Sequence, residues 1–297
     1  MPRTLTPLRY PGGKTRFYSY VKEILKCNNL LGHTYIEPFA GGAGLAIKLL
    51  LNNDVEYIVI NDFDISIYSF WKAILDKTDE FCDMIFSKDV TPEEWYRQRN
   101  IYMQQDHNDI LSLGFATFFL NRTNMSGVIK GGMIGGKNQG GIDKLDARYN
   151  KNDLVKKIQN IAARKEQICL LNLNAQEFLQ SKYFKKYIDA FINFDPPYVK
   201  KGAQLYKNSF KERDHRELSK HISECGGKWI VTYDICPLVS ELYSDYRYSY
   251  LDVNYSIQKN TKAKEYIFFS NNLIIPDEIH VKIKQKESAN SIINMII

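Results

Sequence analysis

The chain has 297 residues, 44% of them hydrophobic and 25% charged, with a formal net charge of +6. It shows no repeat and no low-complexity tract, so we expect one large globular domain or a domain with a substantial insertion. No apolar run reaches the ~18 residues that span a bilayer. The N-terminal stretch MPRTLTPLRY also lacks the apolar segment of a secretory signal. We therefore expect a cytoplasmic protein that does not enter a membrane.

The cysteines do not follow a disulfide or zinc pattern. They are odd in number, scattered, and never spaced as C-x-x-C, at Cys27, Cys82, Cys169, Cys225 and Cys236. We expect them to be packing residues, and we expect no metal ion in the site.

The N-terminal part of the chain predicts a helix followed by a strand-helix-strand unit. RYPGGKTRFYSYVKEIL at 9–25 begins with a Gly-Gly turn and continues as an amphipathic helix. HTYIEPF at 33–39 indicates a strand, followed by the turn AGGAG at 40–44 and the helix LAIKLLLNN at 45–53. EYIVIND at 56–62 is mostly apolar, which is typical of a strand buried on both faces. This order predicts a βαβ unit of a doubly wound α/β sheet.

The alternation of strands and helices stops between about residues 65 and 165, where the pattern is helical. TPEEW at 91–95 places Thr as N-cap, Pro at the first helical position, and Glu94 where it closes a capping box. ILSLGFATFFL at 110–120 is too short to cross a membrane and predicts a core helix.

The second half of this helical region is basic and rich in glycine. Between residues 121 and 165, ten Lys and Arg stand against three Asp, a net charge of +7. Such a concentration suits a polyanion such as nucleic acid, although a solvated helix face with a loop would give the same charge. Seven of the seventeen glycines lie between Gly127 and Gly141, which predicts a long mobile loop, functional or disordered.

The strand and helix alternation then resumes. It predicts strands at 168–174 (ICLLNLN), 187–195 (YIDAFINFD) and 228–234 (KWIVTYD), with a helix at 211–227. YSYLDVNYSI and KEYIFFSN follow as two more strands, which we expect to pair antiparallel. The whole pattern predicts an α/β sheet domain interrupted by a helical, basic insertion.

Three segments could surround a nucleotide-like cofactor. The run from Glu37 to Gly44, EPFAGGAG, follows the first strand of the sheet, where such folds bind their ligand. Glu37 would repel a pyrophosphate but could attract the ammonium and sulfonium of S-adenosylmethionine. Asp62 ends the second strand 18 residues beyond Gly44, close to the ~20 expected of a ribose-binding acid. Tyr10 and Lys14 could flank the methionine end, although each segment alone could equally be a structural turn.

The motif Asp195-Pro196-Pro197-Tyr198 directly follows an apolar strand. Proline lacks a backbone donor and fixes its own φ, so the sheet ladder must stop here. The Asp195 carboxylate and the Pro196 carbonyl are two acceptors on rigid backbone, matching the two hydrogens of an adenine amino group. Accepting both hydrogens makes the nitrogen more nucleophilic, while Tyr198 would stack on the extruded base. Direct in-line methyl transfer would then need only positioning and preorganised acceptors.

Together these motifs resemble the Dam-type, or D12 class, DNA N6-adenine methyltransferases. The resemblance extends to about Asn271 and rests on RYPGGK, EPFAGGAG, IND, DPPY, NSFKERDHREL and VTYD, in the order these enzymes use. It implies a Rossmann-like, S-adenosylmethionine-dependent methyltransferase fold with a helical target-recognition insertion. It also implies two sets of site residues: Tyr10, Lys14, Glu37, Phe39, Gly41, Asp62 and Asp195 at the cofactor, and Asp195, Pro196, Pro197 and Tyr198 at the adenine.

The resemblance makes the insertion the part that recognises double-stranded DNA. FFLNRTNMSG resembles the tip of the family's recognition hairpin, which makes Arg122, Asn124, Ser126 and Lys130 candidates for DNA contacts. The chain departs from GATC-methylating members at Met125 and Ser126, where an aromatic residue and asparagine are usual. The segment after the hairpin is also different, and these departures argue against GATC as the target.

Other activities fit these motifs less well. A cytosine-C5 methyltransferase needs a Pro-Cys nucleophile, and the one such pairing here is the reversed Cys236-Pro237. Cytosine-N4 enzymes usually begin the catalytic motif with Ser or Thr, and release-factor glutamine methyltransferases with Asn. A non-catalytic DNA-binding protein with this fold would not need Lys14, Asp62 and Asp195.

We therefore predict an adenine methyltransferase, monomeric or weakly dimeric, in a restriction-modification or phage/host protection context. A cognate restriction endonuclease is a possible functional partner. The predicted catalytic and cofactor-binding domain comprises residues 1–64 and 166–275, the recognition domain comprises 65–165, and the tail at 276–297 is unassigned.

Overall fold

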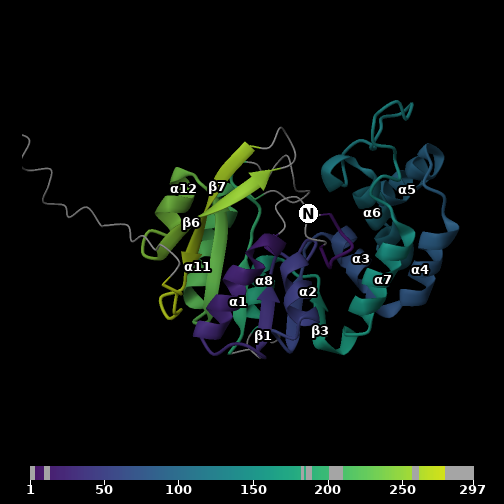
Figure 1. The fold of residues 1–297 in the computed structure, drawn as a ribbon. Helices are drawn as coiled ribbons and strands as arrows, with labels where there is room; N and C mark the ends of the chain where they lie inside the picture. Colours follow the sequence, from purple (N-terminus) through teal and green to yellow (C-terminus); the bar gives the residue numbers. More distant parts are fainter. Residues whose placement is uncertain are drawn as a thin grey trace, which may run out of the picture.

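The structure is a computed structural model that describes residues 4–9, 14–181, 184, 189–200, 210–255 and 261–277. In these residues seven strands form one sheet in the order β3-β2-β1-β4-β5-β7-β6 (Figure 1). The strands are β1 (Thr34–Glu37), β2 (Tyr57–Asn61), β3 (Ile168–Leu171), β4 (Phe191–Phe194), β5 (Lys228–Asp234), β6 (Arg247–Tyr255) and β7 (Thr261–Phe269).

The pairing of the strands places the predicted motifs at one edge of the sheet. β1 lies between β2 and β4 and is parallel to both. β3 pairs parallel with β2, and β5 pairs parallel with β4, whereas β7 runs antiparallel between β5 and β6. The predicted βαβ unit and the antiparallel final pair are thus confirmed. The chain leaves β1 and β4 toward opposite sides of the sheet order, so their carboxyl ends form the crevice where such folds bind ligands.

The helices follow the predicted order. They are η1 (Lys14–Phe17), α1 (Tyr18–Cys27), α2 (Gly44–Leu51), α3 (Ile65–Asp76), α4 (Thr78–Ser87), α5 (Pro92–Gln104), α6 (Ile110–Thr123), η2 (Met125–Gly127), α7 (Lys151–Ala162), η3 (Lys165–Gln167), α8 (Ala175–Gln180), α11 (Glu212–Glu224) and α12 (Pro237–Leu242). Thr91 caps α5 and accepts from the Glu94 amide, as predicted. The Glu94 carboxylate, however, binds Arg97 and Gln98 within the same helix.

Alternate residues of the central strands face two different apolar cores, because successive side chains in a strand point to opposite faces. Tyr35 and Ile58 belong to a core with α1, α2 and the helices between β2 and β3. Ile36 and Val59 belong to a second core, with residues of α8, α11 and α12. The sheet is therefore covered on both faces, as expected of a Rossmann-like methyltransferase fold.

Helices α3 to α7 form the predicted helical insertion, on the right in Figure 1. α6 is buried along nearly its whole length, as the sequence predicted. It lies so close to α3 that a Cβ at Gly114 would be 2.5 Å from the Ser69 carbonyl oxygen. The insertion shares one apolar core with the first face of the sheet rather than enclosing a separate one, so its position relative to the sheet is fixed by packing.

The glycine-rich segment between α6 and α7 is a series of hydrogen-bonded turns rather than a loop without structure. The Met125 amide donates to the Gly132 carbonyl, and the Ile134 amide donates to the Thr123 carbonyl. The side chain of Gln139 donates to the Ile134 carbonyl and accepts from the Leu145 amide. Figure 1 shows this segment rising above α5 and α6. In the described part of the chain, no helix is both long and apolar enough to cross a bilayer.

Candidate active site

The site begins at Glu37, the last residue of β1. Its carboxylate Oε1 accepts from the Tyr35 hydroxyl at 3.0 Å and from the Ala46 amide, in the first turn of α2, at 3.2 Å. Burial is the main cause that raises the pKa of Glu37 to about 8, and the charge of Asp195 contributes in the same direction. The predicted cation-attracting carboxylate therefore lies close to the catalytic motif, and it gains charge only near neutral or higher pH.

The glycine turn after β1 is held against Asp62, which directly follows β2. Gly41 has a φ of +47°, which favours glycine. Its amide donates to Asp62 Oδ2 at 2.8 Å, and its carbonyl accepts from the Trp71 indole at 2.9 Å. The other oxygen of Asp62 accepts from the Asp64 amide at 2.9 Å. Burial raises the pKa of Asp62 to about 7.

The ring of Phe39 is half-buried in the same turn and packs edge-on against Phe210 at 6.0 Å. The predicted cofactor residues Glu37, Phe39, Gly41 and Asp62 thus stand together at the carboxyl ends of neighbouring strands. Tyr10, the other residue predicted at the methionine end of the cofactor, lies outside the described residues.

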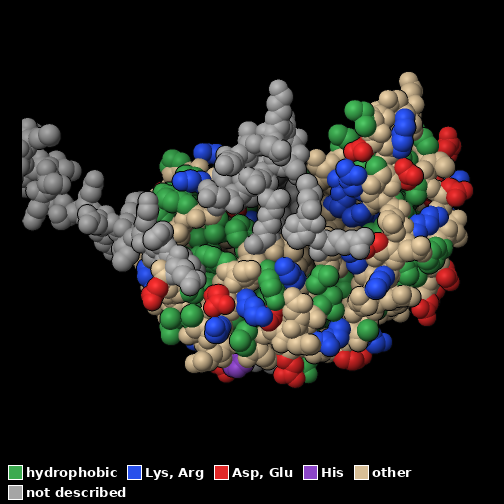
Figure 2. Space-filling model, viewed as in Figure 1, with side chains coloured by type: hydrophobic (Ala, Val, Ile, Leu, Met, Phe, Trp, Pro, Cys, Tyr) green, Lys and Arg blue, Asp and Glu red, His purple; other side chains and the backbone are tan. Residues whose placement is uncertain are grey.

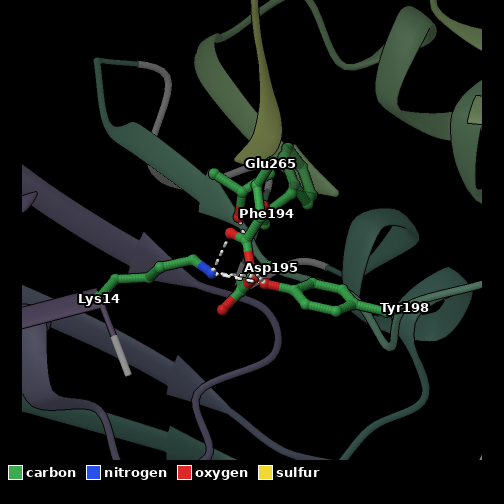
Figure 3. A network of polar contacts seen from close by, with 6 residues as sticks. Lys14, Phe194, Asp195, Tyr198 and Glu265 are labelled. Atoms are coloured by element: carbon green, nitrogen blue, oxygen red, sulfur yellow. Dashed lines mark hydrogen bonds and ion pairs between the residues drawn. The ribbon is translucent and has the colours of Figure 1, made fainter. Parts of the chain in front are cut away.

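Asp195 follows β4, and one of its carboxylate oxygens is held by neighbouring side chains (Figure 3). Its Oδ1 lies 3.0 Å from the Lys14 ammonium and accepts from the Thr232 hydroxyl, in β5, at 2.8 Å. Among the residues that the structure describes, none donates to Oδ2. The side chain remains 22% exposed. Burial raises the pKa of Asp195, and Glu265 adds to this, while Lys14 opposes it.

The Lys14 ammonium donates to three acceptors around Asp195. We call the cluster of Lys14, Asp195, Tyr198 and Glu265 the catalytic corner. Besides Asp195, the ammonium contacts the Tyr198 hydroxyl at 2.8 Å and Glu265 Oε2 at 3.1 Å. Burial alone would lower the pKa of Lys14, but the charges of Asp195 and Glu265 outweigh it, so the pKa is raised. The prediction that Lys14 contacts the cofactor stays a prediction; in this structure its ammonium organises the DPPY motif.

Two further acids hold this corner, and the sequence analysis did not single out either. Glu265, in β7, accepts from the Tyr198 hydroxyl at 2.5 Å and is 1% exposed. Asp234, the last residue of β5, accepts from the amides of Val199 and Lys200 at 3.0 and 2.9 Å. Glu265 shares its face of the strand with Ile267 and Phe269 because side chains alternate. An acid on the apolar face of a strand is the feature of the sequence that could have indicated a role for Glu265.

Tyr198 and both prolines are buried in this structure. The Tyr198 side chain is 4% exposed, and its hydroxyl is fixed between Lys14 and Glu265. Among the described residues, none donates to the Pro196 carbonyl. Within the described part of the chain, Asp195 Oδ2 and the Pro196 carbonyl are therefore both available as acceptors.

The predicted recognition residues gather at the end of α6. Asn124 is fully buried: its side chain accepts from the Trp95 indole at 2.6 Å and donates to the Val128 and Ile129 carbonyls. Arg122 donates to the carbonyls of Arg148 and Pro7. Burial lowers the pKa of Arg122 to about 10, followed in effect by the charge of Arg9.

Lys130 is the most accessible of the four candidates. Ser126 has a φ of +54° and is half-exposed, and Lys130 is exposed. Figure 2 shows Lys and Arg side chains gathered on the insertion, on the side that faces the sheet. The structure thus separates the buried Asn124 from Arg122 and Ser126, which are partly exposed, and from Lys130, which is exposed.

The N-terminal segment joins the end of α6 to the glycine turn. The side chain of Asn121 accepts from the Arg9 amide at 2.7 Å and donates to the Arg9 carbonyl at 2.8 Å. The Thr6 hydroxyl donates to the Gly42 carbonyl at 2.6 Å. Residues 6–9 therefore contact both the end of α6 and the glycine turn, five residues before Lys14.

The chain is similar in sequence to known methyltransferases. The chain is 25% identical over 256 residues to the type II methyltransferase M.CviBI of Paramecium bursaria Chlorella virus NC1A, covering 84% of this chain and 90% of that protein. It is 24% identical over 232 residues to the type II methyltransferase M.MjaIII of Methanocaldococcus jannaschii, covering 72% and 77%. Among solved structures, the rRNA methyltransferase AviRa of Streptomyces viridochromogenes matches with a TM-score of 0.34 and 10% identity, over 87% and 85% of the two chains.

The model of one protein family matches residues 10–257, a stretch that contains the glycine turn, the helical insertion and the DPPY corner. The match covers most of the chain, and it agrees with the resemblance seen in the sequence. The chain belongs to the D12 class of N6 adenine-specific DNA methyltransferases.

Proposed function

We propose that the chain methylates the N6 amine of an adenine extruded from double-stranded DNA, with S-adenosylmethionine as methyl donor and Asp195 as the main acceptor for that amine. The observation that carries this proposal is that the two oxygens of the Asp195 carboxylate differ in their contacts. Oδ1 is occupied by Lys14 and Thr232, while Oδ2 has no donor among the described residues and belongs to a partly exposed side chain. A fixed, charged acceptor at a strand end is what the amine requires.

The carboxyl ends of β1 and β2 fit the donor. Glu37 is a buried carboxylate whose charged form is disfavoured by burial, so a cationic ligand beside it would be stabilised. Asp62 holds the glycine turn through the Gly41 amide, and each of its oxygens retains capacity for a ribose hydroxyl. When bound, S-adenosylmethionine supplies a methyl group on a positively charged sulfur.

The residues of the catalytic corner would act on the amine in three ways. Asp195 Oδ2 accepts one N–H and the Pro196 carbonyl accepts the other, which draws the lone pair out of conjugation with the ring. The new N–C bond forms as the C–S bond breaks, and the sulfur leaves neutral. The surplus proton on nitrogen passes to Asp195 or to solvent. The two acids and one ammonium of the corner carry a net negative charge, which stabilises cationic character nearby.

Tyr198 is proposed to pack on the extruded base. Since the residue is only 4% exposed, entry of a base requires its neighbours to move apart. Its hydroxyl is anchored by Glu265 and Lys14, so the ring can keep its orientation during this movement. Extrusion of the base itself is expected because the N6 amine of a stacked, paired adenine cannot reach a strand end.

The insertion is proposed to recognise the DNA, with residues 1–64 and 166–275 forming the catalytic part and 65–165 the recognition part. Lys130 and Ser126 are proposed to contact DNA directly, and Arg122 and Asn124 to shape the surface that does so. The type II names of the relatives support a role in restriction-modification, together with a cognate endonuclease.

The test is transfer of a labelled methyl group from S-adenosylmethionine to duplex DNA. Wild-type protein should label DNA, and Asp195→Ala should not. Asp195→Asn is the matched variant, because it keeps the side-chain volume while removing the charge. Equal background labelling by all three proteins would leave a DNA-binding protein without catalysis. Label found on cytosine N4 would show that cytosine, and not adenine, is the base that is methylated.

A further inference from the structure

We infer that Glu265 is a positioning residue of this methyl transfer: it holds Lys14 and Tyr198 so that Oδ2 of Asp195 stays open to the adenine amine. The inference rests on the proposed function and assigns a role to a residue of β7. Glu265 lies beyond residues 10–257, the stretch that matches the family model. It reaches the corner from above in Figure 3, while Lys14 and Tyr198 reach it from opposite sides.

The hydrogens of Lys14 match its acceptors in number. The ammonium has three N–H donors, and the structure gives it three acceptors: Asp195 Oδ1, the Tyr198 hydroxyl, and Glu265 Oε2, at 3.0, 2.8 and 3.1 Å. If Glu265 lost its charge, the ammonium would turn toward the remaining carboxylate. Asp195 would then share both oxygens with Lys14, and the acceptor for the substrate would be lost.

Tyr198 is fixed through the other oxygen of Glu265. The tyrosine hydroxyl donates to Oε1 at 2.5 Å and accepts from Lys14. The backbone after Tyr198 is held separately, by Asp234. Glu265 therefore fixes the far end of a ring whose near end is already fixed, and this fixes the long axis of the ring.

The burial of Glu265 argues that its charge is required. The residue is 1% exposed, on a strand face whose next two members are Ile267 and Phe269. Replacing a buried charged network by apolar side chains is often neutral or stabilising for a fold. A purely structural position here would therefore be served equally well by an apolar residue, whereas two separate donors need two carboxylate oxygens.

The charge of Glu265 also affects Asp195. Among the described residues, the charged and titratable groups that act on Asp195 are Lys14 from η1, Glu265 from β7, Tyr233 from β5, and Tyr35 and Glu37 from β1. The hydroxyl of Tyr198, from its own loop, is bound to the same Lys14 ammonium. The negative charge of Glu265 raises the pKa of Asp195. Removing that charge should lower the pKa, so the acidic limb of the rate profile should move to lower pH.

The test compares Glu265→Gln, Glu265→Asp and Tyr198→Phe with wild type in single-turnover methylation of duplex DNA across pH. Glu265→Gln should lower the rate roughly 10–100-fold, as expected for misplaced reacting groups, with KM for DNA little changed. It should also shift the acidic limb to lower pH. Glu265→Asp should lose rate without this shift, because its charge remains. Tyr198→Phe should lower the rate without moving the acidic limb. In the double variant with Glu265→Gln, the two losses of rate should not add.

The control is Glu241→Gln, which removes an exposed carboxylate that pairs with Arg216 and should leave rate and limb unchanged. A wild-type rate and an unmoved acidic limb in Glu265→Gln would overturn the inference and leave the proposed function intact. A readout independent of activity is the thermal unfolding of Lys14→Met, Glu265→Gln and the double variant. Each single change should lower Tm by roughly 5–15 °C, and the double variant should lose less than their sum. Strictly additive losses would mean that Lys14 and Glu265 do not act together.

Discussion

The ammonium of Lys14 lies 3.0 Å from Oδ1 of Asp195, which joins the first helical turn of the chain to the end of β4. Lys14 has its three donors committed to this corner. The relationship changes what its replacement should do. A lysine that bound the cofactor's carboxylate would mainly set cofactor affinity, whereas a lysine that orients Asp195 mainly sets the rate.

We therefore expect Lys14→Met to lower the single-turnover rate by roughly 100-fold or more, because a buried, oriented charge is lost. The Kd for S-adenosylmethionine, measured by calorimetry, should change by less than about 3-fold, since the three N–H donors of Lys14 are already committed to Asp195, Tyr198 and Glu265. Lys26→Met, on the exposed face of α1, is the control. A large rise in Kd with an unchanged rate would place Lys14 at the methionine end of the cofactor, as the sequence first indicated.

Cofactor binding should depend on pH through Glu37. Burial raises the pKa of Glu37 to about 8, so its charged form grows as the pH rises toward that value. A cationic ligand binds the charged form, and binding therefore releases a proton. Between pH 6 and 7.5, below the ~8 at which an α-amino group titrates, affinity should rise with pH.

Calorimetry in two buffers of different ionisation enthalpy measures this proton release. Glu37→Gln keeps the acceptor for the Tyr35 hydroxyl and the Ala46 amide but cannot titrate, so it should remove most of the pH dependence. An unchanged dependence in this variant would assign the proton to another group, such as Asp62.

The fold and the order of motifs could be predicted because each depends on local sequence. The strands around Glu37, Asp62 and Asp195 are short apolar runs that end in an acid, and parallel strands bring those ends to one edge. The cap of α5 at Thr91 needs only four neighbouring residues. Each of these features is determined by residues that lie close together in the sequence.

The partners of the site could not be predicted in the same way. Glu265 contacts Lys14 although 251 positions separate the two residues in the sequence. It lies on β7, the last of the described strands along the chain, which pairs antiparallel with β5. Asn124 is a candidate for DNA contact because FFLNRTNMSG resembles the family's recognition hairpin, but its side chain is buried and bonded to Trp95, Val128 and Ile129. Such roles depend on which side chains the tertiary fold brings together.

The predicted recognition residues should separate stability from DNA contact. Asn124→Ala removes three hydrogen bonds and leaves the Trp95 indole without its acceptor, so it should cost about 2–3 kcal/mol of unfolding free energy. Lys130→Ala should leave Tm within about 1 °C, because its side chain is exposed. It should weaken DNA binding, and the slope of the logarithm of the DNA-binding constant against the logarithm of salt concentration should become smaller by about 1.

Thermal unfolding and DNA titration at several salt concentrations measure both effects. Cofactor affinity should be retained in Lys130→Ala. Unchanged binding, salt slope and methylation pattern in that variant would show that the recognition surface lies elsewhere on the insertion.

The contact between the N-terminal segment and the end of α6 should depend on Gly127. This residue has a φ of +75°, and an added Cβ would lie 2.3 Å from the Arg9 carbonyl oxygen. Gly127→Ala should therefore cost about 1–3 kcal/mol and lower methylation, because Arg9 must move away from Asn121. Gly132→Ala is the matched control, since a Cβ there meets nothing within 4 Å. Equal melting temperatures of the two variants would contradict this account of the contact.

The most direct test of the adenine acceptor is nucleoside analysis of DNA from a methylation-deficient host that expresses the chain. Wild type should yield N6-methyladenine confined to one sequence context, and Asp195→Asn should yield none although it folds with a similar Tm. N6-methyladenine at equal levels from both proteins would contradict the account, because the open oxygen of Asp195 would then not be the group that activates the amine.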